Sequence, residues 1–178
     1  QGRFFRSGSL MDDEEAQSTI REIRSAVKIL SANKIGALLV IERNMGLNDI
    51  SATGIQIDGL ITSDFLMNVF IPNTPLHDGA AVIRGKRLIA AGCLLPLTEN
   101  RSLSTELGTR HRAAIGLSEQ CDALVVVVSE ETGTISIAEN GRIHRHLDGD
   151  QLTHILTPAF AYSSGSPIWD LVRSWRKK

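Results

Sequence analysis

Two short segments carry the residue types best suited to chemistry. The segment Pro75–Ala80 follows a proline-punctuated loop, contains Asp78-Gly79 and leads directly into an apolar strand pattern. This places a carboxylate at a loop–strand boundary, followed by a glycine that has no side chain to keep a ligand away. In Thr109–Arg112, two guanidinium groups flank a histidine where a helical pattern begins. A carboxylate that can hold a metal ion or take a proton, together with two cations suited to phosphate, makes phosphoryl transfer a candidate chemistry.

Both segments also have a structural interpretation, which the residue types alone leave open. An Asp-Gly pair is typical of a turn, and two arginines on a helix are typical of a solvated face. The position of the arginines favours an anion, because cations stabilise the C-terminal end of a helix whereas Arg110 and Arg112 fall in its first or second turn. An anion there would share the helix amides, the guanidinium groups and the Thr109 hydroxyl. Each charge-assisted contact would contribute roughly 1.5–3 kcal/mol.

The remaining histidines, cysteines and paired acids follow no metal-ligand spacing. We interpret His144, His146 and His154 as structural or exposed, and Glu130-Glu131 by itself as an exposed turn. Cys93 lies in an apolar run and is expected to be a small buried hydrophobe. Neither cysteine belongs to a CxxC pair, so the sequence favours a reducing, cytosolic compartment over a disulfide framework or a zinc site.

Composition and length indicate one ordinary globular domain. The 178 residues are 42% hydrophobic and 22% charged, and nineteen basic against twenty acidic residues give a net charge of −1. A duplex-binding domain would show a basic excess, so nucleic acid is disfavoured as a partner. The longest apolar runs are far too short to span a bilayer. Because the chain opens on Gln1 instead of Met, we expect it to be cut from a longer polypeptide.

Hydrophobic periodicity predicts alternating strands and helices, some of the strands joined as hairpins. The predicted helices cover residues 12–33, 65–70, 106–120 and 150–156. The predicted strands cover residues 35–42, 55–57, 80–84, 88–95, 123–129, 134–138 and 142–147. We expect Asp12 or Asp13 to cap the first helix, Ser63 or Asp64 to cap the second, and Pro158 to break the last.

These elements predict an α/β fold: a single domain with a central mixed β-sheet flanked by helices on both faces. We expect residues 12–160 to form this domain, preceded by a loosely held segment at residues 1–11 and followed by a C-terminal tail at residues 161–178.

At the two chemical segments the chain resembles the diadenylate cyclases. Asp78–Ala80 in IPNTPLHDGAAVI and Arg110–Arg112 in ELGTRHRAAIGLSE resemble the DGA and RHR motifs of that family. GALLVIER at Gly36–Arg43 and VSEETG at Val128–Gly133 are also similar to it. The resemblance covers about residues 15–157, with the motifs in the family's order. Within the family the chain looks most like the membrane-tethered CdaA (DacA) type; the additional helical domains of the DNA-scanning DisA type are not among these 178 residues.

The resemblance implies condensation of two ATP into cyclic di-AMP with release of two pyrophosphates. Each 3′-hydroxyl would attack the α-phosphate of the other nucleotide, in line with its departing pyrophosphate. Since one such domain holds one ATP, two domains must meet face to face, and a monomer should be inactive. A divalent cation is implied as cofactor: Mg²⁺ or Mn²⁺, with Co²⁺ as a third candidate.

The resemblance also implies a role for each matched residue. Asp78 would act at the metal and assist deprotonation of the attacking hydroxyl, with His77 and Glu131 as further metal ligands. Gly79 would lie near the ribose and contribute to catalysis together with the arginines. The ATP contacts would be made by Gly79, Ala80, Leu94, Thr109, Arg110, His111, Arg112, Ser129 and Glu130. Of these, Thr109, Arg110 and Arg112 would bind the phosphates and His111 would order that loop.

Leu94 stands where many members of the family carry a Tyr, so an adenine-stacking contact would be weaker here. For the CdaA type the resemblance further implies a catalytic domain in the cytoplasm, tethered to the cell membrane by segments ahead of residue 1. It also implies control by a regulator protein, CdaR, and by phosphoglucosamine mutase.

Two other functions stay open from the sequence. One is a module that binds ATP or cyclic di-AMP without turnover; the other is a regulatory subunit whose face-to-face surface serves complex formation. The intact Asp78 favours the enzyme, because a pure binder has no need of a metal-directed carboxylate beside the phosphates.

Overall fold

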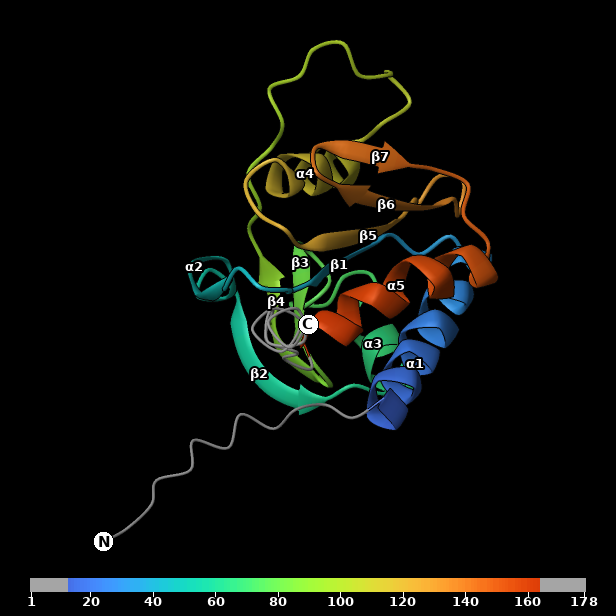
Figure 1. Cartoon of the computed structure of the whole chain (residues 1–178). Coiled ribbons are helices and arrows are strands. Elements are labelled where there is room, and N and C mark those ends of the chain that lie inside the picture. Colours follow the sequence, from blue (N-terminus) through green and yellow to red (C-terminus); the bar gives the residue numbers. More distant parts are fainter. Residues whose placement is uncertain (1–12, 164–178) are drawn as a thin grey trace, which may run out of the picture.

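A computed structural model describes residues 13–163 of the chain as a layered α/β domain (Figure 1). The expected loose segment 1–11 lies outside the described residues, and so do residues 164–178 of the expected tail. No helix in the described part is long and apolar enough to cross a membrane.

One mixed sheet of seven strands organises the described chain, in the order β2-β4-β3-β1-β5-β6-β7. Its strands are β1 (Ala37–Ile41), β2 (Ile55–Leu60), β3 (Ala80–Arg84), β4 (Arg87–Cys93), β5 (Leu124–Val128), β6 (Ile135–Glu139) and β7 (Arg142–His144). In the centre β1 pairs in parallel with β3 and antiparallel with β5, and all five residues of both β1 and β5 are buried. The parallel and antiparallel pairings of β1 confirm the predicted central mixed sheet. The solid apolar runs of β1 and β5 are typical of strands covered on both faces.

Helices cover both faces of this sheet, as predicted (Figure 1). One face packs against α1 (Asp13–Ala32), α3 (Ser63–Val69) and α5 (Gly149–Ser163), and the other against α2 (Asn48–Ser51) and α4 (Thr109–Ser118). The alternation of β1 shows the division: Leu39 and Ile41 face the first helical layer, and Leu38 and Val40 face the second.

Two tight turns join neighbouring strands where the sequence predicts them. Asn140-Gly141 connects β6 to β7 with φ values of 50° and 76°, the left-handed conformation that a two-residue hairpin turn requires. Gly85, with φ of 58°, makes the same kind of reversal possible between β3 and β4.

The predicted break of the last helix at Pro158 is wrong, because α5 continues to Ser163. Leu152, Leu156, Ala159 and Phe160 are all buried on the side that packs in the α1 layer, so extending the helix buries more apolar surface. Pro158 has no N–H to donate to the carbonyl oxygen of His154, four positions earlier. His154 is exposed, so water can replace the missing hydrogen bond.

Several predicted boundaries also move by a few residues. The third predicted helix begins at Thr109, not at residue 106, and the second is capped by Thr62, whose hydroxyl accepts a bond from Phe65 N at 3.1 Å. The second strand does not end at Asp58-Gly59, since Asp58 adopts φ of 54° within a register shift and β2 continues beyond it. The short helix α2 is not among the predicted helices.

Candidate functional site

A cavity of about 700 Å³ lies where the N-terminal end of α4 meets one end of the central strands. Leu38 near the start of β1, Val128 at the end of β5 and Cys93 at the end of β4 all line it. The cavity contains most of the predicted site residues: Asp78, Gly79, Leu94, Thr109, Arg110, His111, Ser129, Glu130 and Glu131. The fold therefore brings the two chemical segments and the Ser129–Glu131 turn to one place.

Three predicted site residues do not line this cavity. Ala80 is fully buried as the first residue of β3. Arg112 lies on α4 two positions after Arg110, which turns its side chain by roughly 200° around the helix axis. His77 is half-buried in the preceding loop, where its Nδ1 lies 2.6 Å from the carbonyl oxygen of Thr74.

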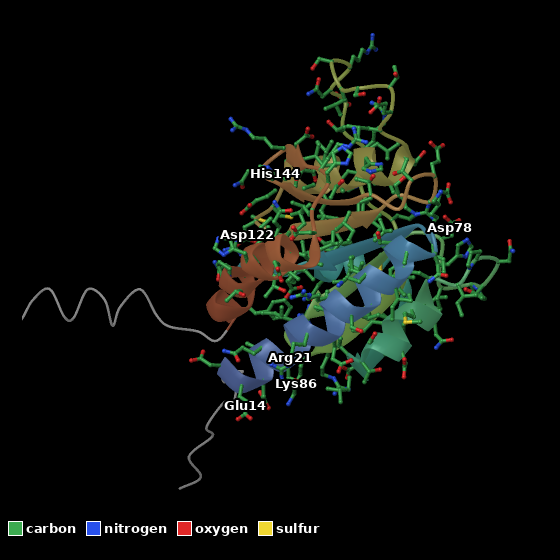
Figure 2. All side chains as sticks on the ribbon, turned by 90° about the vertical axis from the view of Figure 1, so that its right-hand side faces the viewer. Glu14, Arg21, Asp78, Lys86, Asp122 and His144 are labelled. Atoms are coloured by element: carbon green, nitrogen blue, oxygen red, sulfur yellow. The ribbon has the colours of Figure 1, made fainter. Side chains whose placement is uncertain are left out.

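Asp78 and Gly79 form the lip of the cavity before β3. Gly79 has φ of 113°, and a β-carbon at this position would lie 2.6 Å from the carbonyl oxygen of Cys93. The glycine is thus required by its backbone conformation and by close packing on β4, in addition to any approach of a ligand. Asp78 is exposed, and Figure 2 shows it on the opposite side of the molecule from Asp122 and His144 in that view.

The N-terminal end of α4 is open to an acceptor. Its N-cap residue is Gly108, and among the described residues no side chain caps the first turn. Unsatisfied amides at a helix N-terminus, reinforced by the helix dipole, favour an anion. Thr109 and Arg110 start this helix and line the cavity, so the predicted placement of a guanidinium group in the first turn is confirmed.

Arg110 is held between a carboxylate and the backbone just before β1. Its Nη1 lies 3.2 Å from Glu130 Oε2, and its side chain is 25% exposed. On the other side the guanidinium lies over Gly36, just before β1. The cavity therefore presents a fixed cation that already has a negative partner.

His111 is nearly enclosed, with only 5% of its surface exposed. Within the described residues its Nε2 is buried and has no hydrogen-bond partner. Burial lowers the pKa of His111 below its ordinary value, and the positive charges of Arg145 and Arg110 lower it further. The imidazole is thus favoured in its neutral form. Arg145 in turn pairs with Glu106 of the cavity wall at 3.0 Å.

The turn between β5 and β6 is tied to the end of α1. Ser31 Oγ donates to the carbonyl oxygen of Gly133 at 2.5 Å, and Gly133 N donates to Ser129 O at 2.9 Å. Ser129 Oγ accepts from the amides of Glu131 and Thr132 at 3.3 Å each. These bonds hold the segment that carries Glu130 and Glu131 against the cavity.

A family model described as DisA bacterial checkpoint controller nucleotide-binding (DAC) matches residues 24–143, which include every one of these site residues. The chain belongs to the DAC family. Its residues 24–143 contain the whole sheet except the end of β7.

Known proteins are similar to this DAC domain in sequence. The cyclic di-AMP synthase CdaA of Bacillus subtilis (strain 168) is 47% identical over 160 residues, 90% of this chain and 59% of that protein. A diadenylate cyclase of Listeria monocytogenes serotype 1/2a (strain 10403S) is 44% identical over 153 residues, 86% of this chain and 56% of that protein. The chain thus spans a little over half the length of these two relatives.

Solved structures confirm the α/β single-domain fold of the DAC chain. A crystal structure of a double cysteine mutant of DacA from Staphylococcus aureus matches it with a TM-score of 0.81 at 42% identity, covering 83% of this chain and 98% of that one. A hypothetical membrane spanning protein from Bacillus cereus matches with a TM-score of 0.70 at 46% identity, covering 72% and 63% of the respective chains.

The DAC cavity also has an apolar wall that the sequence analysis did not assign to the site. Besides the strand residues, this wall consists of Leu95, Leu97 and Ala113. The loop after β4 lies against α4, because Thr98 N donates to Arg112 O at 3.0 Å and Thr98 Oγ1 donates to Glu119 at 2.6 Å. The leucine-rich run 94–97 in that loop was the available signal, but its contact with α4 is visible only in the fold.

The donors for a metal ion are only partly assembled in this DAC domain. No group of three or more His, Cys, Asp or Glu side chains in the described part is arranged to hold a metal ion. Asp78 and Glu131 nevertheless line the same cavity. Since the carbonyl oxygen of Thr74 can only accept, Nδ1 of His77 is the donor of this bond, which leaves Nε2 as the ring nitrogen that a metal would use. Carboxylate oxygens are the donors that a Mg²⁺-like ion prefers, and the side chains of Asp78 and Glu131 are the ones that would hold it.

Proposed function

We propose that the chain is the catalytic domain of a diadenylate cyclase, which condenses two ATP into 3′,5′-linked cyclic di-AMP and two pyrophosphates. The observation that carries the proposal is the single cavity that holds both Asp78 and the uncapped, arginine-bearing start of α4. It supports a phosphate-binding acid–base site in a DAC domain whose relatives in B. subtilis and L. monocytogenes are named cyclic di-AMP synthase and diadenylate cyclase.

The residues of the cavity divide naturally between the two ends of ATP. The amides at the start of α4, the Thr109 hydroxyl and the Arg110 guanidinium form the positive end, suited to the triphosphate. The apolar wall with Leu94 and Leu97 is suited to the adenine ring. For Arg110 to bind phosphate, it must release Glu130, which the nucleotide replaces as the negative partner.

The chemical step needs a base and a charge-compensating group. Asp78 accepts the proton of the 3′-hydroxyl as the oxygen attacks the α-phosphorus, and the bond from that phosphorus to the bridging oxygen breaks to release pyrophosphate. Asp78 and Glu131, with Nε2 of His77, would hold the divalent ion, Mg²⁺, Mn²⁺ or Co²⁺. When bound, the ion offsets the negative charge on the phosphate oxygens.

Two such domains are needed to close the ring. One cavity of about 700 Å³ accommodates one nucleotide, whose 3′-hydroxyl must reach the α-phosphate held by a second domain. The cavity rim carries exposed apolar side chains, with Leu94 70% and Leu97 55% exposed. These features support a face-to-face homodimer as the active form.

The regulation and location implied by the resemblance form a separate, finer part of the proposal. We propose that the domain acts in the cytoplasm next to the cell membrane and is controlled by CdaR and phosphoglucosamine mutase, which could block dimerisation. Co-purification with each partner, followed by assay of the complex, tests this part alone.

The proposed reaction is tested by incubating the purified chain with ATP and Mn²⁺, Mg²⁺ or Co²⁺ across a range of chain concentrations. Chromatography should reveal cyclic di-AMP whose rate per chain rises with concentration, since two domains must meet. ATP that stays bound but unconverted at every concentration and with every metal would instead support the binding module.

A further inference from the structure

Gly36 lies directly under the guanidinium group of Arg110. It is a buried residue immediately before β1, whose first residue, Ala37, pairs with Val128 at the end of β5. A β-carbon at position 36 would lie 2.6 Å from Arg110 Nη1, 2.7 Å from Cζ and 3.1 Å from Nη2. The guanidinium group therefore occupies the space that any side chain at position 36 would need.

The backbone does not explain why this residue is glycine. Its φ lies outside the left-handed region, so an L-residue could adopt the same conformation. At Gly79 and Gly133, by contrast, φ is positive and the atoms in the way belong to the backbone. At Gly36 the three nearest atoms all belong to one side chain, and that side chain is Arg110.

We propose that Gly36 is a positioning residue for Arg110, deepening the proposed function on which this inference rests. The flat backbone at position 36 supports the guanidinium on one side, and Glu130, 3.2 Å from Nη1, is its partner on the other side until the triphosphate replaces it. This support directs Arg110 to the triphosphate at the start of α4. A methyl group at position 36 displaces the guanidinium, because the end of an arginine side chain moves more easily than a buried strand.

Gly36→Ala tests this support, and Gly46→Ala is its matched control. Position 46 also has φ outside the left-handed region, and no described atom lies within 4 Å of its β-carbon position. ATP and inorganic tripolyphosphate are titrated calorimetrically into each variant without added metal, so that binding is measured without turnover. We expect Gly36→Ala to weaken both ligands about 10- to 100-fold, the loss of one charge-assisted contact, while its thermal midpoint is kept. Gly46→Ala should bind as the unaltered chain does.

A double-mutant cycle separates positioning from a general defect. In the Arg110→Ala background no guanidinium is left to displace, so Gly36→Ala should weaken tripolyphosphate no further. Unchanged affinity of the single variant, or an equal loss in both backgrounds, overturns the inference. So does a crystal structure of Gly36→Ala in which the guanidinium has not moved.

The same titrations keep this inference distinct from the proposed function. If the chain binds ATP and the double-mutant cycle gives the expected result, but no cyclic di-AMP forms with any metal, the proposed cyclase activity is wrong. The positioning of Arg110 by Gly36 is then still supported. If Gly36→Ala forms cyclic di-AMP at the same rate and binds ATP with the same affinity as the unaltered chain, the cyclase activity is supported. The positioning role of Gly36 is then wrong.

Discussion

Arg110 and Glu130 show how a single ion pair sets the resting state of the site. The pair spans 3.2 Å, but the Glu130 side chain is 66% exposed, so solvent screens the attraction. Exposed pairs of this kind contribute roughly 0.2–1 kcal/mol. That is small beside the binding of a triphosphate, and this difference lets the nucleotide take over the guanidinium.

We expect Glu130→Gln to tighten metal-free ATP binding by about two- to fivefold, because Arg110 then loses a competing partner. Isothermal titration calorimetry at low salt measures the change. Glu106→Gln is the control, since it removes a carboxylate that lines the same cavity but pairs with Arg145 instead of Arg110. An equal gain in both variants would mean that overall charge, and not the Arg110 pair, controls affinity. Weaker binding in Glu130→Gln would mean that the carboxylate itself holds the ligand.

His111 links the site to pH through the stability of the fold. Its pKa is lowered by burial and by the charges of Arg145 and Arg110, so the folded chain binds this proton less readily than the unfolded chain does. The unfolded state then holds more protons as pH falls below about 6.5. The contribution of neutral His111 to stability is therefore complete above that pH and is lost below it. Two carboxylates face this cluster: Glu106, which pairs with Arg145, and Glu130, which pairs with Arg110.

We expect the free energy of unfolding to fall as pH drops below about 6.5, and His111→Gln to flatten that dependence. Urea denaturation at a series of pH values measures the slope. His144→Gln is the matched control, because His144 is exposed on the edge strand β7 and should leave the slope in place. A slope that survives in His111→Gln would assign the pH dependence to other groups.

At the scale of elements, the loop after β4 and the helix α4 depend on one another through Gly116. A β-carbon at position 116 would lie 2.1 Å from Pro96 O and 2.6 Å from Thr98 N, so both obstacles are backbone atoms. This close approach places Leu95 and Leu97 on the cavity wall beside α4. The adenine end of the proposed site is therefore built by packing between two elements.

Gly116→Ala should accordingly destabilise the fold by about 1–3 kcal/mol, despite the better helix propensity of alanine. Chemical denaturation measures this loss, and Gly46→Ala is again the control that should cost little. The contrast with Gly36→Ala is informative, since a movable side chain is in the way there and a backbone is in the way here. Equal stability of Gly116→Ala and the unaltered chain would mean that residues 96–98 can move away freely.

The sequence predicts the elements better than it predicts their ends or their mutual contacts. Solid valine and leucine runs identify β1 and β5, because a doubly covered strand needs apolar residues at every position. Pro158 misleads, since local propensity favours a break while tertiary packing of α5 on α1 outweighs it. Arg112 was grouped with Arg110 by motif, yet helical geometry turns the two side chains apart. Gly36 gives no local signal, because its neighbour Arg110 is 74 positions away in the sequence.

For the whole molecule, the decisive question is how many complete cavities one product requires. Each cavity binds one nucleotide in the proposed function, and ring closure needs both 3′-hydroxyls to react. A dimer with one defective protomer can make one of the two bonds, which yields a linear dinucleotide that still carries a triphosphate. Asp78 is suited to test this, because it is exposed and its replacement should spare the fold.

Asp78→Asn alone should lose about 10²- to 10⁴-fold in cyclic di-AMP formation, the usual contribution of a general base, while keeping its thermal midpoint. Undiminished turnover in this variant would remove Asp78 from the chemistry.

When Asp78→Asn is mixed in equal amounts with the unaltered chain, only about a quarter of randomly formed dimers should have two intact sites. The yield of cyclic di-AMP should fall to about that fraction of the yield from the same total amount of unaltered chain, with the linear dinucleotide accumulating in its place. Mixing with Gly46→Ala instead should leave the yield unchanged. A yield of about half in the Asp78→Asn mixture would show that each protomer completes the ring without its partner's carboxylate, and the requirement for two complete cavities would then be wrong.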